Sequence, residues 1–389
     1  MLIQRASVLS LGILAWACGA EGPLSSAAPT ASATPDPNAR NMTLLAHLDL
    51  TALHNGVAHA QHDEPAVIGP NGAGSGNWGY TSPDGRRFAL TGTSAGLSIV
   101  EVSDPRKPRA IGLVPGATSQ WREVRTYGHY LYISTEAKTG LDIVDMADPD
   151  HPRKVQTWSK TFTSAHTVTV DTERGLLFAN GANGRRGGMR VLDIGTDPED
   201  PEEVGALYDF YVHDGHLRGT VYYASAIYDG FESLLDTSDP RRLREITRFF
   251  TGGRFTHNSW LTRDGRYLFT TDERSGRPLE GWDLLDPLAP RKVSEYLGRA
   301  GTIPHNVMVD GDRLLVAHYV EGVHLLDIRN PEQPVLLGSY DTYLGTEEGF
   351  HGAWGAYIFP GSDVIVVSDI EGGLYVVGYS GPGGGRFHR

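Results

Sequence analysis

The sequence predicts an all-β fold, a seven-bladed β-propeller whose blades are four-stranded and antiparallel. Three observations lead to this prediction. A unit of similar length recurs seven times along the 389-residue chain, two different markers keep the same phase in it, and each unit holds short strand-like runs separated by turn residues. No helical period is long enough to compete with these runs. Four antiparallel strands in each repeat of about 45 residues are typical of propeller blades.

The first marker is a largely apolar pentapeptide, which we interpret as the third strand of each unit. These pentapeptides end 43 to 51 residues apart, and the first six are followed by turns such as SDPRKP and ADPDHP. Proline restricts φ and an Asp or Asn side chain bonds its own backbone, so such turns punctuate a chain after a strand. The pentapeptides are LSIVE (97–101), LDIVD (141–145), MRVLD (189–193), ESLLD (232–236), LEGWD (279–283), VHLLD (323–327) and LYVVG (374–378).

The second marker is a hairpin glycine upstream of each pentapeptide, between the first and second strands of the unit. Successive glycines lie 43 to 50 residues apart, so this marker keeps phase with the first. In the sixth unit the two markers predict strands over 305–310, 313–319, 322–328 and 334–340. The seven glycines are Gly85, Gly128, Gly175, Gly219, Gly265, Gly311 and Gly361.

The seventh unit lacks a fourth strand, because Gly378 leads directly into a glycine-rich tail. Residues 43–50, TLLAHLDL, have the pattern of the missing strand and precede the first unit. We expect them to pair with the last unit and close the ring, which removes the exposed edges of an open array. A linear solenoid is the alternative, but it needs capping repeats that the sequence lacks. The predicted propeller domain is 42–379.

The N-terminal segment predicts export. Residues 1–18 combine Arg5, a short apolar run and small residues at the end, as a secretory signal peptide does. The single cysteine, Cys18, follows Leu14-Ala15-Trp16-Ala17, which resembles a bacterial lipoprotein box, so we expect lipidation of Cys18. Ordinary cleavage before Cys18 is the alternative. Residues 19–41 are poor in large apolar side chains and predict a flexible tether, and residues 380–389 a disordered tail.

Segments 96–112, GLSIVEVSDPRKPRAIG, and 140–155, GLDIVDMADPDHPRKV, resemble the LVIVD repeat of bacterial surface proteins. The chain over roughly 43–379 is similar to the choice-of-anchor B group, whose members share such a domain and differ in how they attach to the cell. The resemblance implies a propeller at the outer membrane or cell surface, and it implies no particular reaction, because propellers serve many functions. The residues that carry the wider resemblance are Trp78-Gly79, Trp121-Arg122, Ala165-His166, His213-Asp214, Thr256-His257, Asp272-Glu273, His305-Asn306 and Gly352-Ala353-Trp354.

Histidines recur at the start of the first strand in units three to seven, with Trp78 and Trp121 at the corresponding position of the first two units. The first strand of a blade is innermost, so these side chains should meet at one mouth of the central channel. Neutral imidazole is a common ligand of transition metals, which predicts a divalent metal of unknown identity, or a small polar ligand, at this mouth. A hydrogen-bonded channel lining is the alternative. The proposed ligands are His166, His213, His257, His305 and His351.

The second strand of each blade runs back to the same mouth, so residues at its end could orient the imidazoles from a second shell. Carboxylates and histidine side chains in these places are the ones that we expect near the metal. They are Glu136, Asp272, Glu273, His318 and Asp369.

Composition and local motifs exclude several classes of function. The net charge is −13 and no Lys/Arg run occurs, which excludes a nucleic-acid-binding role. One cysteine excludes an internal disulfide and any cysteine-built metal site. Gly92-Thr93-Ser94-Ala95-Gly96 matches a nucleophile elbow but joins two strands, so we interpret it as a turn.

We therefore expect an exported, lipid-anchored LVIVD-repeat propeller that acts as a monomeric binding protein at the bacterial surface or in the periplasm. Its partner would be a protein, peptide or saccharide at the propeller face, and its membrane contact would be the lipid anchor alone. If Cys18 is not lipidated, the protein would be periplasmic or secreted. The sequence leaves enzyme activity open, with no catalytic residue assigned. The alternative function is a metalloenzyme, a hydrolase or oxidase, that uses the His-rich mouth.

Overall fold

The computed structural model of the protein describes residues 36–54, 72–184, 187–385 and 387. They belong to one compact unit that begins at Asp36. The predicted signal peptide 1–18, with Cys18, lies outside the described residues, as does the predicted tether up to residue 35. Within the described part of the chain, no helix combines the length and the apolar character needed to cross a membrane.

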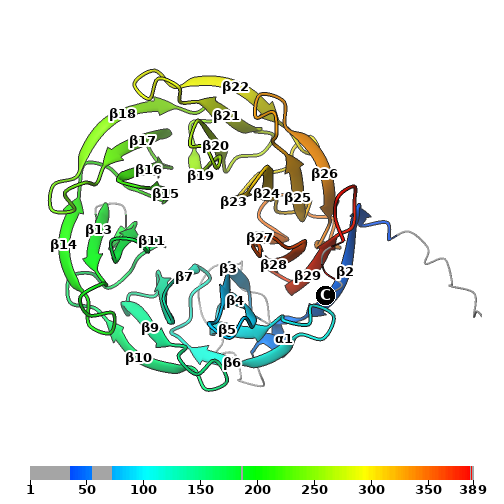
Figure 1. Ribbon diagram of the computed structural model, residues 1–389, viewed down its shortest axis with the longest axis horizontal. Helices are drawn as coiled ribbons and strands as arrows, with labels where there is room; N and C mark the ends of the chain where they lie inside the picture. Colours follow the sequence, from blue (N-terminus) through cyan, green and yellow to red (C-terminus); the bar gives the residue numbers. More distant parts are fainter. Residues whose placement is uncertain (1–35, 55–71, 185–186, 386, 388–389) are drawn as a thin grey trace, which may run out of the picture. The chain divides into compact units, whose positions relative to one another are not determined.

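Seven antiparallel sheets stand around a central axis, each with the first strand of its repeat innermost (Figure 1). Six of these sheets have four strands, and the sheet of blade six has a fifth strand at its outer edge. Each innermost strand contacts the innermost strands of both neighbouring sheets, and the last sheet contacts the first, so the ring is closed. The predicted seven-bladed propeller is therefore confirmed.

The strands of each blade follow one another in chain order from the axis outward, except at the closing blade. The first three blades are β3 (Gly74–Thr81), β4 (Arg87–Thr93), β5 (Gly96–Glu101) and β6 (Arg109–Pro115); β7 (Arg122–Tyr127), β8 (Tyr130–Thr135), β9 (Leu141–Asp145) and β10 (Arg153–Trp158); and β11 (Thr167–Asp171), β12 (Leu176–Asn180), β13 (Met189–Asp193) and β14 (Glu202–Leu207). The next two are β15 (Asp214–Arg218), β16 (Val221–Ala226), β17 (Phe231–Asp236) and β18 (Arg244–Phe250); and β19 (Thr256–Leu261), β20 (Tyr267–Asp272), β21 (Leu279–Asp283) and β22 (Arg291–Tyr296). The sixth is β23 (Val307–Asp310), β24 (Arg313–Ala317), β25 (Val323–Asp327) and β26 (Val335–Tyr340), and the seventh begins with β27 (Ala353–Ile358), β28 (Val364–Asp369) and β29 (Gly373–Tyr379).

Both sequence markers have a clear backbone role. All seven hairpin glycines have φ between +57° and +86°, a region that only glycine adopts without strain. In the six turns after the third strands, the Asp or Asn before proline accepts a hydrogen bond from the N–H two residues further on, as Asp148 Oδ1 does from Asp150 at 3.0 Å. The residues that recur from blade to blade are therefore those that determine the conformation of the turns.

The closing strand comes from the N-terminal end of the described residues. β2 (Met42–Leu48) pairs antiparallel with β29, from Met42 opposite Tyr379 to Leu48 opposite Leu374, and completes the seventh blade. The prediction of ring closure is confirmed, although the strand stops before the predicted residue 50. The reason is local: the Asp49 carboxylate accepts from Ala52 N at 2.8 Å and caps the one-turn helix α1 (Leu50–Leu53).

Two segments at the ends of the predicted domain are also ordered. β1 (Ala39–Arg40), within the expected tether, pairs with β26 as a fifth strand of blade six. Phe387, within the expected disordered tail, is buried in the apolar core of the seventh blade. The second strand of each blade is buried along almost its whole length, because both faces of a blade pack on neighbouring blades. In β28, for example, every residue is buried.

Candidate metal centre

Four of the predicted imidazoles meet at one end of the inner strands. We call His166, His213, His257 and His305 the imidazole arc. Their ring centroids are 4.0 Å apart for His166–His213, 4.6 Å for His213–His257 and 4.3 Å for His257–His305. All four residues are buried. Blades three to six each contribute one imidazole, and the short distances between neighbouring rings make them a continuous row.

The strand register explains this row and corrects its fifth member. Thr167, Asp214, Asn258 and Gly355 each pair with the equivalent residue of the second strand in their blades, and each follows a residue at the arc position. In blade seven that preceding residue is Trp354. The Trp354 and His305 rings lie 4.9 Å apart, so the indole continues the row.

His351, the predicted fifth ligand, is three residues out of this register and lies apart from the arc. Its Nδ1 is 2.6 Å from Glu371 Oε1, its ring stacks on Tyr343 at 5.3 Å, and its side chain is 35% exposed. The cause is the connection that precedes β27, which displaces the histidine from the strand phase. In blade two the arc position holds Arg122, a buried guanidinium that donates to Thr93 O at 3.0 Å, and the predicted equivalent Trp121 is its exposed neighbour.

Two of the five predicted second-shell residues contact the arc. Glu136 Oε1 lies 2.6 Å from His166 Nδ1. Glu273 lies between two imidazoles, with Oε2 3.8 Å from His257 Nε2 and Oε1 3.5 Å from His305 Nε2. Tyr319 donates its hydroxyl to Glu273 Oε1 at 2.6 Å and holds this carboxylate in place.

The other three predicted second-shell residues serve different purposes. Asp272 accepts from Gly253 N and Phe255 N, both at 2.7 Å, and Asp369 accepts from Gly372 N at 2.7 Å, so both carboxylates order turns. His318 stacks on His324, with ring centroids 5.1 Å apart, and contacts no arc imidazole within the part of the chain that the structure describes. His318 and Tyr319 follow the end of β24, and the turn, in which Tyr319 has a φ of +43°, directs the side chain of Tyr319 to the arc and that of His318 away from it.

The donor atoms of His213, His257 and Glu273 lie within 4.8 Å of one another, a separation that suits a shared metal ion. Both ring nitrogens of His213 and Nδ1 of His257 are buried and have no hydrogen-bond partner. Leaving such atoms unsatisfied costs about 1–3 kcal/mol each. Two imidazoles and one carboxylate are also a ligand set that zinc adopts in proteins.

Burial sets the charge state of this group. It lowers the pKa of His213 and of His257 well below the usual histidine range, and the neighbouring imidazoles lower both further. Burial also lowers the pKa of His305 to about 3 and raises the pKa of Glu273 to about 7. These three imidazoles are therefore neutral at physiological pH, which is the form that binds a metal. A cation between them would favour the charged form of Glu273.

The end members of the arc are held differently. Burial acts to lower the pKa of His166, but the hydrogen bond with Glu136 and the negative charges of Glu136, Asp214 and Glu123 together outweigh burial, so the pKa is raised. His305 Nδ1 hydrogen-bonds the Trp354 carbonyl oxygen. With the proton on Nδ1, this contact leaves His305 Nε2 as a free lone pair facing Glu273. A ligating histidine commonly donates its other N–H to a carbonyl in this way.

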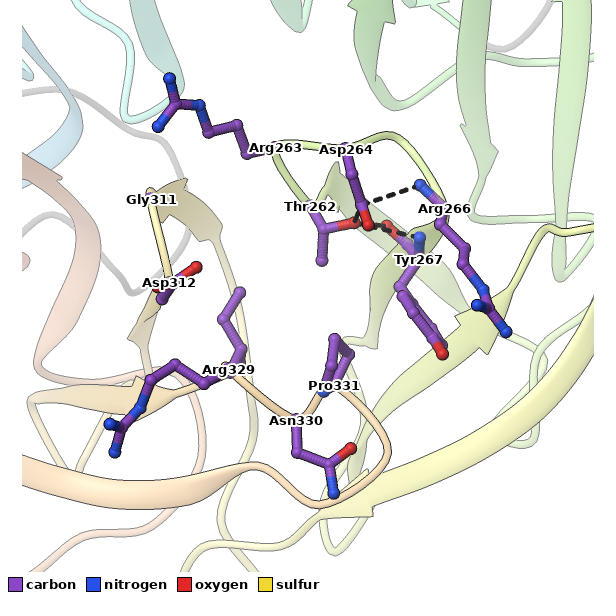
Figure 2. Close-up of a pocket in the computed structure, with 11 residues that line it drawn as sticks. Thr262, Arg263, Asp264, Arg266, Tyr267, Gly311, Asp312, Arg329, Asn330 and Pro331 are labelled. Carbon is purple, nitrogen blue, oxygen red and sulfur yellow. Dashed lines mark hydrogen bonds between the residues drawn. The ribbon is translucent and has the colours of Figure 1, made fainter.

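A separate cavity lies at the other end of the strands (Figure 2). It has a volume of about 670 Å³ and is formed by the turn between β19 and β20 together with turns of blade six. Two of its arginines are already neutralised, since Arg266 pairs with Asp283 at 3.1 Å and Arg329 pairs with Asp327. It contains no cluster of metal-ligating side chains comparable to the arc among the described residues.

The fold and this site define a seven-bladed propeller with a histidine-rich channel mouth. The LVIVD repeat matches residues 120–158 and 303–342, so the chain carries LVIVD repeats in blades two and six. No curated protein matches the sequence.

Solved structures share the fold at low sequence identity. A candidate 6-phosphogluconolactonase from Bacteroides fragilis has a TM-score of 0.57 and 12% identity, over 78% of this chain and 89% of that one. A structural genomics target from Lactobacillus plantarum has a TM-score of 0.58 and 15% identity, over 76% and 88%. The periplasmic gluconolactonase of Pseudomonas aeruginosa has a TM-score of 0.53 and 16% identity, over 70% and 86%. At such identity these similarities establish the fold alone.

Proposed function

We propose that this protein binds a divalent transition metal at the channel mouth through His213, His257 and Glu273. The observation that carries the proposal is the convergence of their donor atoms within 4.8 Å, while both ring nitrogens of His213 are buried without a hydrogen-bond partner. A metal ion would satisfy these atoms and would stabilise the carboxylate. Its identity follows from the ligands: imidazole with one carboxylate suits zinc and its neighbours in the first transition row.

The proposed biological role is recognition at the cell surface or in the periplasm, by an exported, lipid-anchored monomer of the choice-of-anchor B group. Two exposed aromatic rings near the arc support a binding role. Trp121 is 38% exposed, and Phe350 is 50% exposed with its ring 5.4 Å from that of Tyr319. Such rings bind apolar peptide side chains or the apolar face of a sugar, so a protein, peptide or saccharide partner fits this mouth.

Metal analysis of the purified full chain tests the binding site. After incubation with zinc and removal of excess, the His213→Ala/His257→Ala double variant should retain one zinc equivalent fewer than the wild type. The matched control is His151→Ala, because His151 is an exposed histidine paired with Asp148 at 2.8 Å on a turn. A double variant that keeps the full wild-type zinc content would contradict the proposal.

Lipid anchoring is tested separately at Cys18, the only cysteine of the chain. In a bacterial host, the Cys18→Ser variant should move from the membrane fraction to the soluble fraction, because a lipid anchor requires the thiol. Unchanged membrane association of the variant would exclude lipidation as the mode of attachment. The metal site and the anchor can fail independently, since the two measurements share no readout.

A metal-dependent hydrolase is the second candidate function. The observation that favours it is the size of the ligand set: two imidazoles and one carboxylate are three protein ligands, and catalytic zinc sites keep a fourth position for water or substrate. Two of the structural neighbours bear lactonase names, so sugar lactones are the first substrates to assay. Zinc-dependent hydrolysis that disappears in the His213→Ala/His257→Ala variant would support an enzyme. Zinc binding without turnover would support the binding role.

A further inference from the structure

A second group of metal-ligating side chains lies in blade six, on the tight hairpin between β24 and β25. His318 and Glu321 belong to the turn and His324 to β25, so the three residues fall at spacings of three along the chain. The turn is closed by hydrogen bonds from His318 N to Gly322 O and from Gly322 N to Tyr319 O, both 2.8 Å long. We call His318, Glu321 and His324 the hairpin cluster.

The three side chains of the hairpin cluster converge. Their donor atoms lie within 4.8 Å of one another, and the His318 and His324 rings stack with centroids 5.1 Å apart. His318 Nδ1 is 3.2 Å from Glu321 Oε2 but lacks hydrogen-bond geometry, so both ring nitrogens of His318 are buried without a hydrogen-bond partner. The side chain of His318 is only 2% exposed. An imidazole placed this way is costly unless something binds its nitrogen.

Other groups already orient the remaining two side chains. Glu321 accepts from the backbone N–H of Arg299, at 2.9 Å for each carboxylate oxygen, and from Thr302 Oγ1 at 2.7 Å. Tyr296 Oη lies 3.0 Å from His324 Nδ1, which leaves Nε2 of this ring for a metal. Second-shell partners of this kind fix the rotamer and the tautomer of metal ligands.

The backbone makes room for the cluster at Gly298. A Cβ atom at this position would lie 2.0 Å from Glu321 Oε2 and 2.9 Å from His318 Cε1, so only glycine fits without moving the two side chains. On the solvent side, a cavity of about 260 Å³ is lined by Glu321 and His324 together with Arg40 and Arg299. This cavity gives an ion a path to the cluster and gives a fourth ligand space beside it.

We propose that His318, Glu321 and His324 bind one divalent transition metal, with zinc the best match, at a site separate from the imidazole arc. Two imidazoles and one carboxylate supply three ligands, and a water molecule or small anion from the cavity supplies the fourth. The site joins the β24–β25 hairpin to the segment 296–302 through Glu321 and Tyr296. Because β1 lines the same cavity through Arg40, the metal also stabilises the edge of blade six where the N-terminal segment pairs.

The test uses the purified full chain with zinc chloride alone as the probe. In the His213→Ala/His257→Ala background, which removes the arc ligands, we expect one zinc per chain by elemental analysis and calorimetry. Adding His318→Ala should abolish this equivalent, and adding Gly298→Ala should weaken it by crowding the ligands. Adding His151→Ala should leave it unchanged. Tyr296→Phe, which keeps the ring but removes the partner of His324, should weaken zinc binding 10- to 100-fold.

Two results would overturn the proposal: a folded background protein that binds no zinc, or zinc that persists unchanged after His318→Ala. Folding is followed by circular dichroism. If the background variant does not fold, the same substitutions are made in the wild-type chain, where His318→Ala should reduce the zinc content by one equivalent. Failure of the arc proposal looks different, because the hairpin equivalent then remains in the wild type and is still lost in His318→Ala.

Discussion

The imidazole arc and the hairpin cluster use the same donor types but draw them from very different lengths of chain. The arc extends from His166 to His305 and takes one imidazole from each of four blades. The hairpin cluster lies between His318 and His324, within one turn and the strand that follows it. A site of the first kind depends on the register of the whole ring, and a site of the second kind depends on one hairpin.

The two sites meet at one pair of consecutive residues. Tyr319 donates to Glu273 at the arc, whereas His318 stacks on His324 in the hairpin cluster. Tyr319 has φ of +43°, unusual for a residue with a side chain, so the turn that holds His318 and Glu321 also aims the tyrosine. Variants on either side of this turn can therefore separate the two sites.

The largest expected effect comes from opening the ring. Deletion of residues 42–48 removes β2, and the buried side chains of Met42 and Leu45 alone contribute about 1.5–3 kcal/mol each. We expect the midpoint of urea unfolding, monitored by tryptophan fluorescence, to shift to a clearly lower urea concentration. Zinc affinity at the arc should fall more than affinity at the hairpin cluster, because only the arc needs several blades in register. Thr43→Ala, at an exposed position of β2, is the control. Equal unfolding of the deleted and intact chains would refute ring closure as the source of stability.

A buried carboxylate outside both sites provides a pH prediction. Glu232 accepts from Ser225 Oγ at 2.7 Å and from Ser259 Oγ at 2.6 Å, linking blades four and five, and burial raises its pKa to about 7. Between the unfolded pKa of 4.5 and the folded value, the native state keeps a proton that the unfolded state has lost, so stability falls as the pH rises.

The Glu232→Gln variant should lack this contribution. From pH 5 to pH 8 the wild type should lose on the order of 2–3 kcal/mol more unfolding free energy than the variant, measured by urea titration at each pH. Added zinc should leave this difference unchanged, because Glu232 has no imidazole among its hydrogen-bond partners, unlike Glu273 with its neighbouring arc histidines. Parallel pH profiles for wild type and variant would show that Glu232 titrates normally.

A matched pair of tyrosine variants distinguishes the arc from the hairpin cluster. Tyr319→Phe removes the hydroxyl that holds Glu273, and Tyr296→Phe removes the one beside His324. Each should weaken zinc binding at its own site about 10- to 100-fold, equal to about 1.4–2.7 kcal/mol, and leave the other site unchanged. Calorimetry resolves the two affinities when the other site has been removed by substitution. Crossed effects would mean that the hairpin couples the sites.

The smallest effect is expected at His351. Its ion pair with Glu371 is partly exposed, and such pairs are worth about 0–1 kcal/mol. His351→Ala should change zinc affinity at the arc less than about twofold, because Trp354 holds the arc position in blade seven. A loss of tenfold or more would place His351 among the ligands and would break the register assignment.

Sequence periodicity was sufficient to predict most of the fold, because each blade contains turn residues that require a particular backbone conformation. Gly85 and its six equivalents must adopt positive φ, and the Asp or Asn turns bond their own backbone, so both leave a visible mark. The arc was visible in part for the same reason, since His166 and His213 keep the repeat spacing. His351 misled because spacing alone tolerates a shift of three residues, which the strand pairing of Gly355 with Ser368 does not.

The hairpin cluster was missed for a different reason. Its local pattern, His318, Glu321 and His324, is plain in the sequence, but a His at the end of a second strand was expected to face the channel with its neighbours. Which of two consecutive side chains faces the channel depends on the turn geometry, and Gly298, far from the turn in sequence, makes the space. Neither the turn geometry nor the position of Gly298 can be recognised from the sequence repeat.

The amino-acid sequence was sufficient to predict the all-β class, the number of blades and the turns, because local backbone preferences recur along the chain. It was also sufficient to predict the closing strand, because the seventh unit lacks a fourth strand. Which donor atoms share a site depends on how the strands and turns pack in three dimensions. Glu273 lies beside His257 of its own blade and reaches His305 through packing between blades five and six. His318 joins Glu321 and His324 through a turn backed by Gly298. The physical reason is that a metal site needs donor atoms within a few ångströms, and side-chain direction at that scale is set by register and packing.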